Sequence, residues 1–446
     1  MRTAEPNREA SGRVSEYGGY LFIIDETQRA SRVEGHIHAE ETFTDTLSVS
    51  DWHTKQAEIF FISLDGHSIR YAALAHRGKV VATDKRQVRF TNFVELSPAV
   101  PLRQIQEMLD PRIQSYFVRS SSGLGSRVTP KTWQGLMEVV KRLRPGSKKE
   151  LERLETLRQM RPEFFRRPGI ETLAEERDAV NLALRMSDFD KKEILKWSPP
   201  EGDDLPPFVQ GLQSATLIED QMIAHDAEVF GDWGRLKRYQ VGYAVFNKGQ
   251  ERLTVMNVNR HNVERTLGVD LFYYHYRYDA YVMVQYKRMV KEKESGGAVY
   301  RLNGKSYRNE LERMQEFERI LKRAEPRLPY GLRDYRLHAG TSYFKLCPAE
   351  IFDLTSTDMM KGMYLPLDYW EMLIMSPEIL GPQGGELITY DNVERYFTNT
   401  LFVELVQAGW IGSRLLRTEV LTDLARNAIN GNRSLLLAAM VSARSS

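Results

Sequence analysis

The polar residues Asp270, Gln285 and Lys287 lie in a mainly apolar stretch of the sequence, GVDLFYYHYRYDAYVMVQYKRM at residues 268–289. Asp270 begins the first apolar run, and Gln285 and Lys287 lie within the second. Aromatic and β-branched residues dominate both runs, as they do in the strands of a buried hairpin. Burying a lysine costs free energy unless its charge is paired or used. The three side chains are therefore candidates for a shared chemical role.

The spacing of these residues predicts that they meet on one face of the hairpin. Side chains alternate between the two faces of a strand, so Gln285 and Lys287 project to the same side. Val284 and Tyr286 then face the other way. The fold of the hairpin brings Asp270 close to the other two polar groups, at one end of the sheet.

A carboxylate, an amide oxygen and an ammonium group together can support the cleavage of a phosphodiester. A hard cation such as Mg²⁺ takes oxygen ligands and keeps several waters, so one or two carboxylates and a carbonyl oxygen suffice. The metal lowers the pKa of a water and stabilises charge on a phosphate oxygen. A nearby lysine can orient the water or offset the developing charge. The simpler alternative is a buried hairpin with Gln285 and Lys287 at an exposed edge.

The pattern G-V-D at 268–270 followed by Q-Y-K at 285–287 resembles the PD-(D/E)xK nuclease superfamily. More narrowly, it resembles the Mrr-like restriction endonucleases, in which Gln replaces the acidic residue of the third motif. The resemblance covers about residues 208–350, and the absence of Pro before Asp270 departs from the family pattern.

The resemblance implies a role for each residue of the pattern. Asp270 and Gln285 would bind Mg²⁺ or Mn²⁺, and Lys287 would serve the attacking water. A helical Glu often completes such a site. Glu264 is the first choice, as both metal ligand and catalytic residue, and Glu228 is the second.

The same resemblance implies a nuclease that cleaves DNA in a restriction or anti-phage system. Such effectors combine a sensor with a nuclease and can depend on a partner protein, for example a prokaryotic Argonaute, or on a homo-oligomer. Two alternatives stay open. The site would serve an RNase equally well, and the chain could be a non-catalytic nucleic-acid- or protein-binding subunit that keeps the nuclease fold.

Short strand-like runs before residue 100 predict a separate β-rich domain, with a recognition or regulatory role, at residues 1–146. The turn signals Asp-Gly at 65–66 and Arg-Gly at 77–78 favour short connections. We therefore expect an antiparallel barrel or curled sheet, distinct from the sheet that bears Asp270, with a helix over 130–143. The runs are YLFII (20–24), EIFFISL (58–64), SIRYAALA (68–75), KVVAT (79–83) and QVRFTNFVEL (87–96).

The rest of the chain reads as a helical connector and a nuclease domain. The connector covers residues 147–207 and ends in the linker WSPPEGDDLPP. Residues 208–446 predict a mixed-sheet core with a C-terminal helical extension, so the chain as a whole is of the α+β or α/β class. The expected core elements are helices near 214–230, 305–324 and 391–409, and strands at 238–246, 252–259 and 341–348 around the hairpin.

The helix expected at 305–324 follows the Q-Y-K strand directly. It could present Tyr307 and Arg308 to the phosphate backbone of a nucleic acid. Because acidic residues alternate with its basic residues, an ordinary solvated helix is the alternative.

Composition sets wider limits on the function. The formal net charge is +2, which excludes a simple polycation but allows a local basic groove. The single cysteine, Cys347, excludes a disulfide framework and a thiolate zinc site, and it fits a reducing cytoplasm. We find no apolar run of about 18 residues, so no membrane span is expected.

Overall fold

The computed structural model describes two compact units, Met1–Phe165 and Arg166–Ser446, which are treated separately below. The described residues are 17–24, 26–38, 43–48, 56–82, 85–159, 167–197, 205–212, 240–258, 269–292, 297–302, 305–324, 331–348, 357–381, 384–414 and 433–442. The helix expected near 214–230 lies outside them.

A six-stranded mixed sheet forms the centre of the first unit, in the order β2-β5-β4-β3-β1-β6. β1 runs parallel to β3, and the other neighbouring pairs are antiparallel. The expected barrel is therefore wrong, because this sheet is open, with β2 and β6 at its edges among the described residues. Its strands are β1 (Gly19–Ile23), β2 (Phe43–Leu47), β3 (Glu58–Ser63), β4 (Ser68–Ala82), β5 (Lys85–Pro101) and β6 (Arg127–Val128).

Two local expectations explain the error in the first unit. Arg77 and Gly78 were expected to form a turn, but β4 runs through them and pairs with β5 along a ladder with register shifts. A fully antiparallel sheet was also expected. Because α1 and β2 intervene between β1 and β3 in the chain, the connection is long enough for the parallel pair that the structure has.

Helices cover both faces of this sheet, as the alternation of its side chains requires. Ile59 and Phe61 of β3 pack against α4 and α5, whereas Phe60 and Ile62 pack against α1. The helix expected over 130–143 is confirmed, and α5, expected in the connector, belongs to this core. The helices are α1 (Thr27–His38), α2 (Leu102–Met108), α3 (Pro111–Ser120), α4 (Pro130–Leu143) and α5 (Lys148–Gln159).

The second unit contains a nine-stranded mixed sheet with the main order β13-β12-β10-β9-β15-β8-β7. β10 runs parallel to β12 and β9 runs parallel to β15, and β11 and β14 extend the sheet from β10. Asp270 therefore lies in a different sheet from residues 17–96, as expected. The strands are β7 (Gln240–Lys248), β8 (Glu251–Val258), β9 (Val269–His275), β10 (Ala280–Lys291), β11 (Ala298–Arg301), β12 (Ser342–Pro348), β13 (Met363–Pro366), β14 (Leu387–Thr389) and β15 (Ser434–Ser442).

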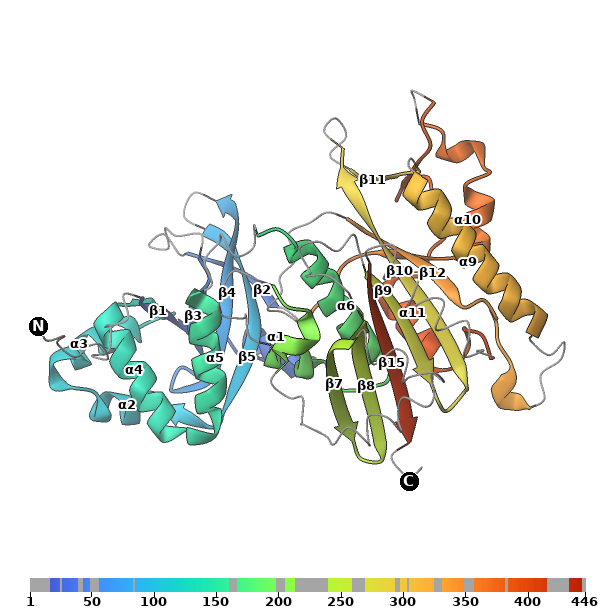
Figure 1. Cartoon of the computed structure of the whole chain (residues 1–446). Helices are drawn as coiled ribbons and strands as arrows, with labels where there is room; N and C mark the ends of the chain where they lie inside the picture. The colour runs from blue at the N-terminus through green and yellow to red at the C-terminus, as the bar shows by residue number, and fades with distance from the viewer. Residues whose placement is uncertain are drawn as a thin grey trace, which may run out of the picture. The chain divides into compact units, whose positions relative to one another are not determined.

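Two helices sandwich the central strands of the second sheet (Figure 1). α6 (Ile170–Met186) lies on the face of Tyr273 and Tyr286: the Tyr286 hydroxyl bonds to Asp178 in the middle of the helix, and the Tyr273 hydroxyl bonds to Ser187 just beyond its end. α9 (Lys305–Ala324) packs on the opposite face, against Phe272 and Phe344. The expected helix at 305–324 and the expected strands of this region are confirmed.

The sequence predicts a helical C-terminal extension. This prediction is wrong in part, because the C-terminal segment also supplies the strand β15 to the middle of the sheet. It also contains α10 (Leu367–Leu373) and α11 (Asn399–Gln407). α11 begins after Thr398, whose side chain accepts a hydrogen bond from the Leu401 amide, rather than near Asp391. Short 3₁₀ turns lie at Pro145–Ser147, Lys191–Lys196, Phe208–Gly211, Leu332–Asp334 and Pro377–Ile379.

Candidate active site

The three polar residues of the hairpin meet at its open end. Asp270 of β9 is the register partner of Gln285 of β10, and Lys287 lies two residues further along β10. Gln285 and Lys287 are almost fully buried, with exposed fractions of 4% and 8%. Their arrangement on one face follows from the alternation of side chains in a strand.

A second carboxylate comes from α9, where Glu310 lies beside these residues. Leu311, Met314 and Phe317 of the same helix pack in the core beneath this face of the sheet, and this packing fixes the position of Glu310. Lys287 Nζ donates to Glu310 Oε2, and Gln285 Nε2 donates to the same oxygen at 3.5 Å. The helix after the Q-Y-K strand thus supplies an acidic residue to the site.

A second cation, Arg433, enters the cluster from the residue before β15. Its Nε and one terminal nitrogen donate to the two carboxylate oxygens of Asp270 at 3.0 and 2.7 Å. Its other terminal nitrogen donates to Glu310 Oε1 at 3.4 Å. Arg433 is 5% exposed, so the ion pair with Asp270 is largely shielded from water.

The electrostatics of the cluster differ for its two cations. Burial lowers the pKa of Lys287, and the nearby charge of Arg433 lowers it further, while Glu310 and Asp270 oppose the shift. Burial also acts to lower the pKa of Arg433, but the charge of Asp270 and the hydrogen bonds to it outweigh burial and raise that pKa. Lys287 is therefore the group of this pair that releases a proton more readily.

One oxygen in the cluster has no hydrogen-bond donor among the described residues. It is Oε1 of Gln285, a buried amide oxygen. A buried polar atom without a partner costs free energy, so its position here favours a ligand that can use an oxygen donor. Together with Asp270 and Glu310, it gives the oxygen donors that suit Mg²⁺ or Mn²⁺.

This set is small for a metal site built from protein groups alone. Within the described ranges, no group of three or more His, Cys, Asp or Glu side chains could hold a metal ion. Two carboxylates and one amide oxygen are nevertheless enough for Mg²⁺, which usually keeps several waters.

The residues next to the site in the chain point to the opposite face, where α6 holds them. Because Tyr286 and Arg288 alternate with Gln285 and Lys287, contacts on this back face restrain the strand that bears the site. The contacts are Tyr286 OH to Asp178 Oδ2 at 2.8 Å, Arg288 Nε to Glu175 Oε1 at 2.5 Å, and Ser434 Oγ to Glu176 Oε1 at 2.6 Å.

The helical glutamate of the site differs from the one expected from the sequence. Glu264 and Glu228 lie outside the described residues, so Glu310 is the helical glutamate that the structure brings to Lys287. The sequence carries a signal for it, since Glu310 interrupts the apolar face of an amphipathic helix. Arg433 carries no comparable signal, because only the pairing of β9 with the distant β15 brings it to Asp270.

Tyr307 and Arg308, expected to contact a nucleic acid, have different surroundings. The Tyr307 hydroxyl accepts a hydrogen bond from Trp370 Nε1 at 2.9 Å, and its ring packs against Tyr300. Arg308 is exposed. Of the two, Arg308 is the better placed to reach a phosphate.

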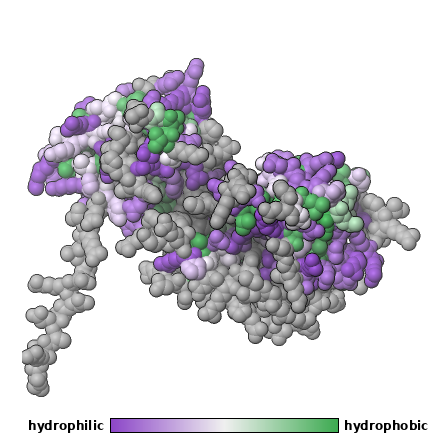
Figure 2. Space-filling view, turned by 90° about the horizontal axis from the view of Figure 1, so that it is seen from above, coloured by the Kyte–Doolittle hydropathy of each residue, from purple (hydrophilic) through white to green (hydrophobic). Residues whose placement is uncertain are grey.

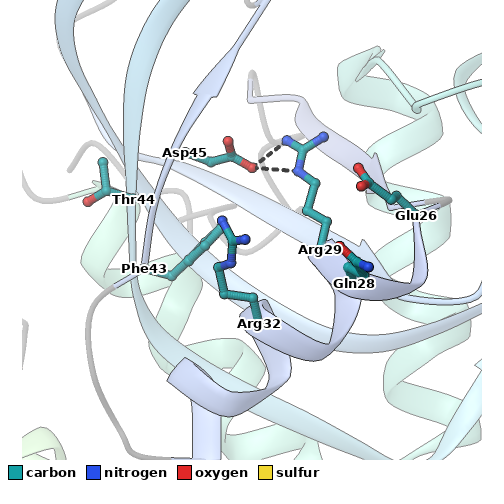
Figure 3. A pocket seen from close by; sticks show the side chains of 7 residues that line it. All are labelled: Glu26, Gln28, Arg29, Arg32, Phe43, Thr44 and Asp45. Atoms are coloured by element: carbon teal, nitrogen blue, oxygen red, sulfur yellow. Dashed lines mark hydrogen bonds and ion pairs between the residues drawn. The ribbon is translucent and has the colours of Figure 1, made fainter.

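The first unit has a hollow of about 460 Å³ between α1 and β2 (Figure 3). Arg29 Nε donates to Asp45 Oδ2 at 3.1 Å across this hollow. The two guanidinium groups of its lining are matched by two carboxylates, so the lining gives no charge preference for an anion. The lining residues are Glu26, Gln28, Arg29, Arg32, Phe43, Thr44 and Asp45.

Hydrophobic residues lie in small separate groups on the coloured part of the face drawn in Figure 2. Three exposed apolar side chains of the second unit, Tyr335, Leu337 and Trp410, lie together near the turn of the β9–β10 hairpin, where Arg336 bonds to the Tyr278 carbonyl. Since Lys287 lies seven residues along β10 from the turn, this group is roughly 20 Å from the candidate site.

No family model, no curated protein and no solved structure matches this chain. Among the described residues, no helix is long and apolar enough to span a membrane.

Proposed function

We propose that the second unit is a metal-dependent nuclease of the PD-(D/E)xK type that cleaves DNA. The observation that supports this most is a cluster in which Gln285 and Lys287 contact Glu310, Asp270 lies opposite Gln285, and a buried oxygen of Gln285 lacks a donor among the described residues. In this proposal Glu310 takes the role first expected of Glu264.

Asp270, Gln285 and Glu310 would hold Mg²⁺ or Mn²⁺, which when bound would lower the pKa of a water and stabilise charge on the phosphate. Lys287 would orient the attacking water and contact a phosphate oxygen. Its lowered pKa, caused by burial and by Arg433, eases the transfer of a proton at Nζ.

The wider role is proposed from the family resemblance. The chain would act in the cytoplasm as a restriction or anti-phage effector, and a partner protein such as a prokaryotic Argonaute would activate it. The first unit, with its separate sheet and core, would supply recognition or regulation.

One observation favours a second candidate, a non-catalytic binding subunit that keeps the nuclease fold. Asp270 and Glu310 are balanced by Lys287 and Arg433, so the described cluster is charge-neutral without any metal. Buried, balanced ion clusters also occur as purely structural features.

The test is incubation of the purified full chain with plasmid DNA and with RNA, each in Mg²⁺, Mn²⁺ or EDTA. Cleavage of DNA in either metal, its loss in EDTA and its loss in Glu310→Gln would support the proposal. Glu312→Gln is the matched control, because Glu312 is an exposed residue of the same helix. Cleavage of RNA alone would favour the RNase alternative, and no cleavage of either substrate would favour the binding subunit.

A further inference from the structure

Arg433 occupies an unusual position, because its guanidinium lies between the two carboxylates that would bind the metal. It donates to both oxygens of Asp270, at 2.7 and 3.0 Å, and to Glu310 Oε1 at 3.4 Å. It also donates to the backbone carbonyl oxygen of Tyr286 at 3.5 Å. One side chain thus spans β9, β10 and α9.

We infer that Arg433 is a resident counter-cation of the site and competes with a divalent metal ion for Asp270. The inference rests on the proposed metal-dependent function for the identity of the competitor. Arg433 would set the metal affinity, as a positioning residue that holds the two carboxylates in place until the metal displaces it.

The contacts of the carboxylates provide the first argument for competition. Arg433 engages both oxygens of Asp270 and one of Glu310, while Lys287 and Gln285 engage the other oxygen of Glu310. A metal ion bound at about 2.1 Å from an Asp270 oxygen would lie beside the guanidinium. Since both are cations in a poorly solvated site, they would repel one another strongly.

The balance of charge provides the second argument. The four charged side chains cancel, and each of the two cations is at most 9% exposed at its side chain. Adding a divalent ion leaves an excess of two positive charges, unless a phosphodiester and a hydroxide arrive with it. The resident arginine therefore disfavours metal binding before substrate is present, and favours the two together.

Arginine suits this role better than lysine. Its planar fork matches both oxygens of a carboxylate, whereas an ammonium group makes a single-point contact. Replacing Arg433 with lysine should therefore give a competitor that is displaced more easily. Replacing it with glutamine should remove the competitor altogether.

The experiment measures Mn²⁺ binding to the metal-stripped full chain, by electron paramagnetic resonance of the free ion, in the absence of nucleic acid. Arg433→Gln should bind Mn²⁺ at least about fivefold more tightly than the wild type, the lower end of ordinary coupling between sites. Arg433→Lys should fall between the two. Arg319→Gln is the matched control, since Arg319 is an exposed arginine of α9 that pairs with Glu316 away from the cluster, and it should bind Mn²⁺ as the wild type does.

Each other outcome overturns the inference. Equal or weaker Mn²⁺ binding by a folded Arg433→Gln, checked by circular dichroism, would show that Arg433 does not compete. If that variant does not fold, Arg433→Lys decides the question by the same criterion. Absence of Mn²⁺ binding in every variant would also overturn it. Failure of the proposed function is seen separately, as the absence of metal-dependent cleavage of DNA by the wild type, whatever the Mn²⁺ affinities of the variants.

Discussion

Asp270 of β9 lies directly opposite Gln285 of β10, in an antiparallel pair that runs from this point to the hairpin turn. On its other side, Asp270 is the register partner of Leu435 of β15, two residues after Arg433. The pairing of β9 with β10 therefore presents the Gln285 amide to Asp270, and the pairing of β9 with β15 presents the Arg433 guanidinium. The chemistry of the site depends on which of these contacts Asp270 keeps.

Removal of the Asp270 carboxylate should abolish metal-dependent cleavage and also destabilise the second unit. From the sequence alone, Asp270→Ala is expected to relieve repulsion between carboxylates. The contact with Arg433 reverses that expectation, because the variant leaves a buried guanidinium with Glu310 as its remaining carboxylate partner in this cluster. We expect a loss of about 3 kcal/mol in the free energy of unfolding, measured in urea. An increase in stability would contradict the ion pair.

Substitutions of Glu310 and Glu264 show which of these two glutamates serves the site. Glu310→Gln keeps the size of the side chain but removes the charge that faces Lys287 and Arg433. We expect the cleavage rate to fall by at least about 100-fold, as for the loss of one electrostatic partner in an active site. Glu264→Gln should then leave most of the activity. The reverse pattern would return the role to Glu264.

The sequence predicts the local parts of this site and misses the distant ones. Gln285, Lys287 and Asp270 belong to one hairpin, and both strand alternation and a short turn are visible in the sequence. Arg433 comes to the site only through the parallel pairing of β15 with β9. Parallel neighbouring strands are joined by long connections, so the local sequence does not predict that β15 lies beside β9.

The same dependence on distant strand pairing explains why the fold predicted for the first unit is wrong. The sequence predicts strands at β1, β3, β4 and β5, because aromatic and β-branched residues mark strands locally, but it does not predict β2 or β6 and divides β4 into two runs. Gly78 predicts a turn, but β4 continues through it as part of a long irregular ladder with β5. Barrel closure depends on whether the edge strands pair, and in the described part of the first unit the edge strands β2 and β6 do not pair with each other.

A fully buried ion pair on the back face offers a test of how the second unit is held together. Lys345 Nζ contacts Asp178 Oδ2, and neither side chain is exposed. Lys345→Met would leave Asp178 buried without its cation, and should cost about 3–5 kcal/mol of stability. The double variant Asp178→Leu with Lys345→Met should recover part of that loss. The control is Lys248→Met, which breaks an exposed pair with Asp188 and should cost at most about 1 kcal/mol.

His275 should make the second unit sensitive to acid. Burial lowers the pKa of His275 from 6.5 to about 4, with the charge of Arg277 acting in the same direction. Between these values the unfolded chain takes up a proton that the folded chain refuses, so stability falls as the pH drops below about 6.5.

The measurement for His275 compares urea unfolding at pH 7 and pH 5. The wild type should lose about 2 kcal/mol more than His275→Phe over this interval, from a shift of 1.36 kcal/mol per pKa unit. The acidic residues titrate in both proteins, so the difference isolates the histidine. Equal losses would mean that His275 accepts a proton in the folded state as readily as in the unfolded chain.

Lys287, a buried lysine in an apolar strand, should be needed for cleavage but not for DNA binding. Lys287→Ala should abolish cleavage while leaving DNA affinity nearly unchanged, because its ammonium acts on one water and one phosphate, where charge builds in the transition state. Binding would depend mainly on other Lys and Arg residues, each with a small salt-dependent share. DNA affinity and cleavage rate should be measured in parallel for this variant and for Lys291→Ala, an exposed lysine of the same strand. Affinity that falls in step with the rate would identify a phosphate-binding lysine. Normal values of both would mean that Lys287 serves only to neutralise Glu310, and the charge-balanced cluster would then be structural.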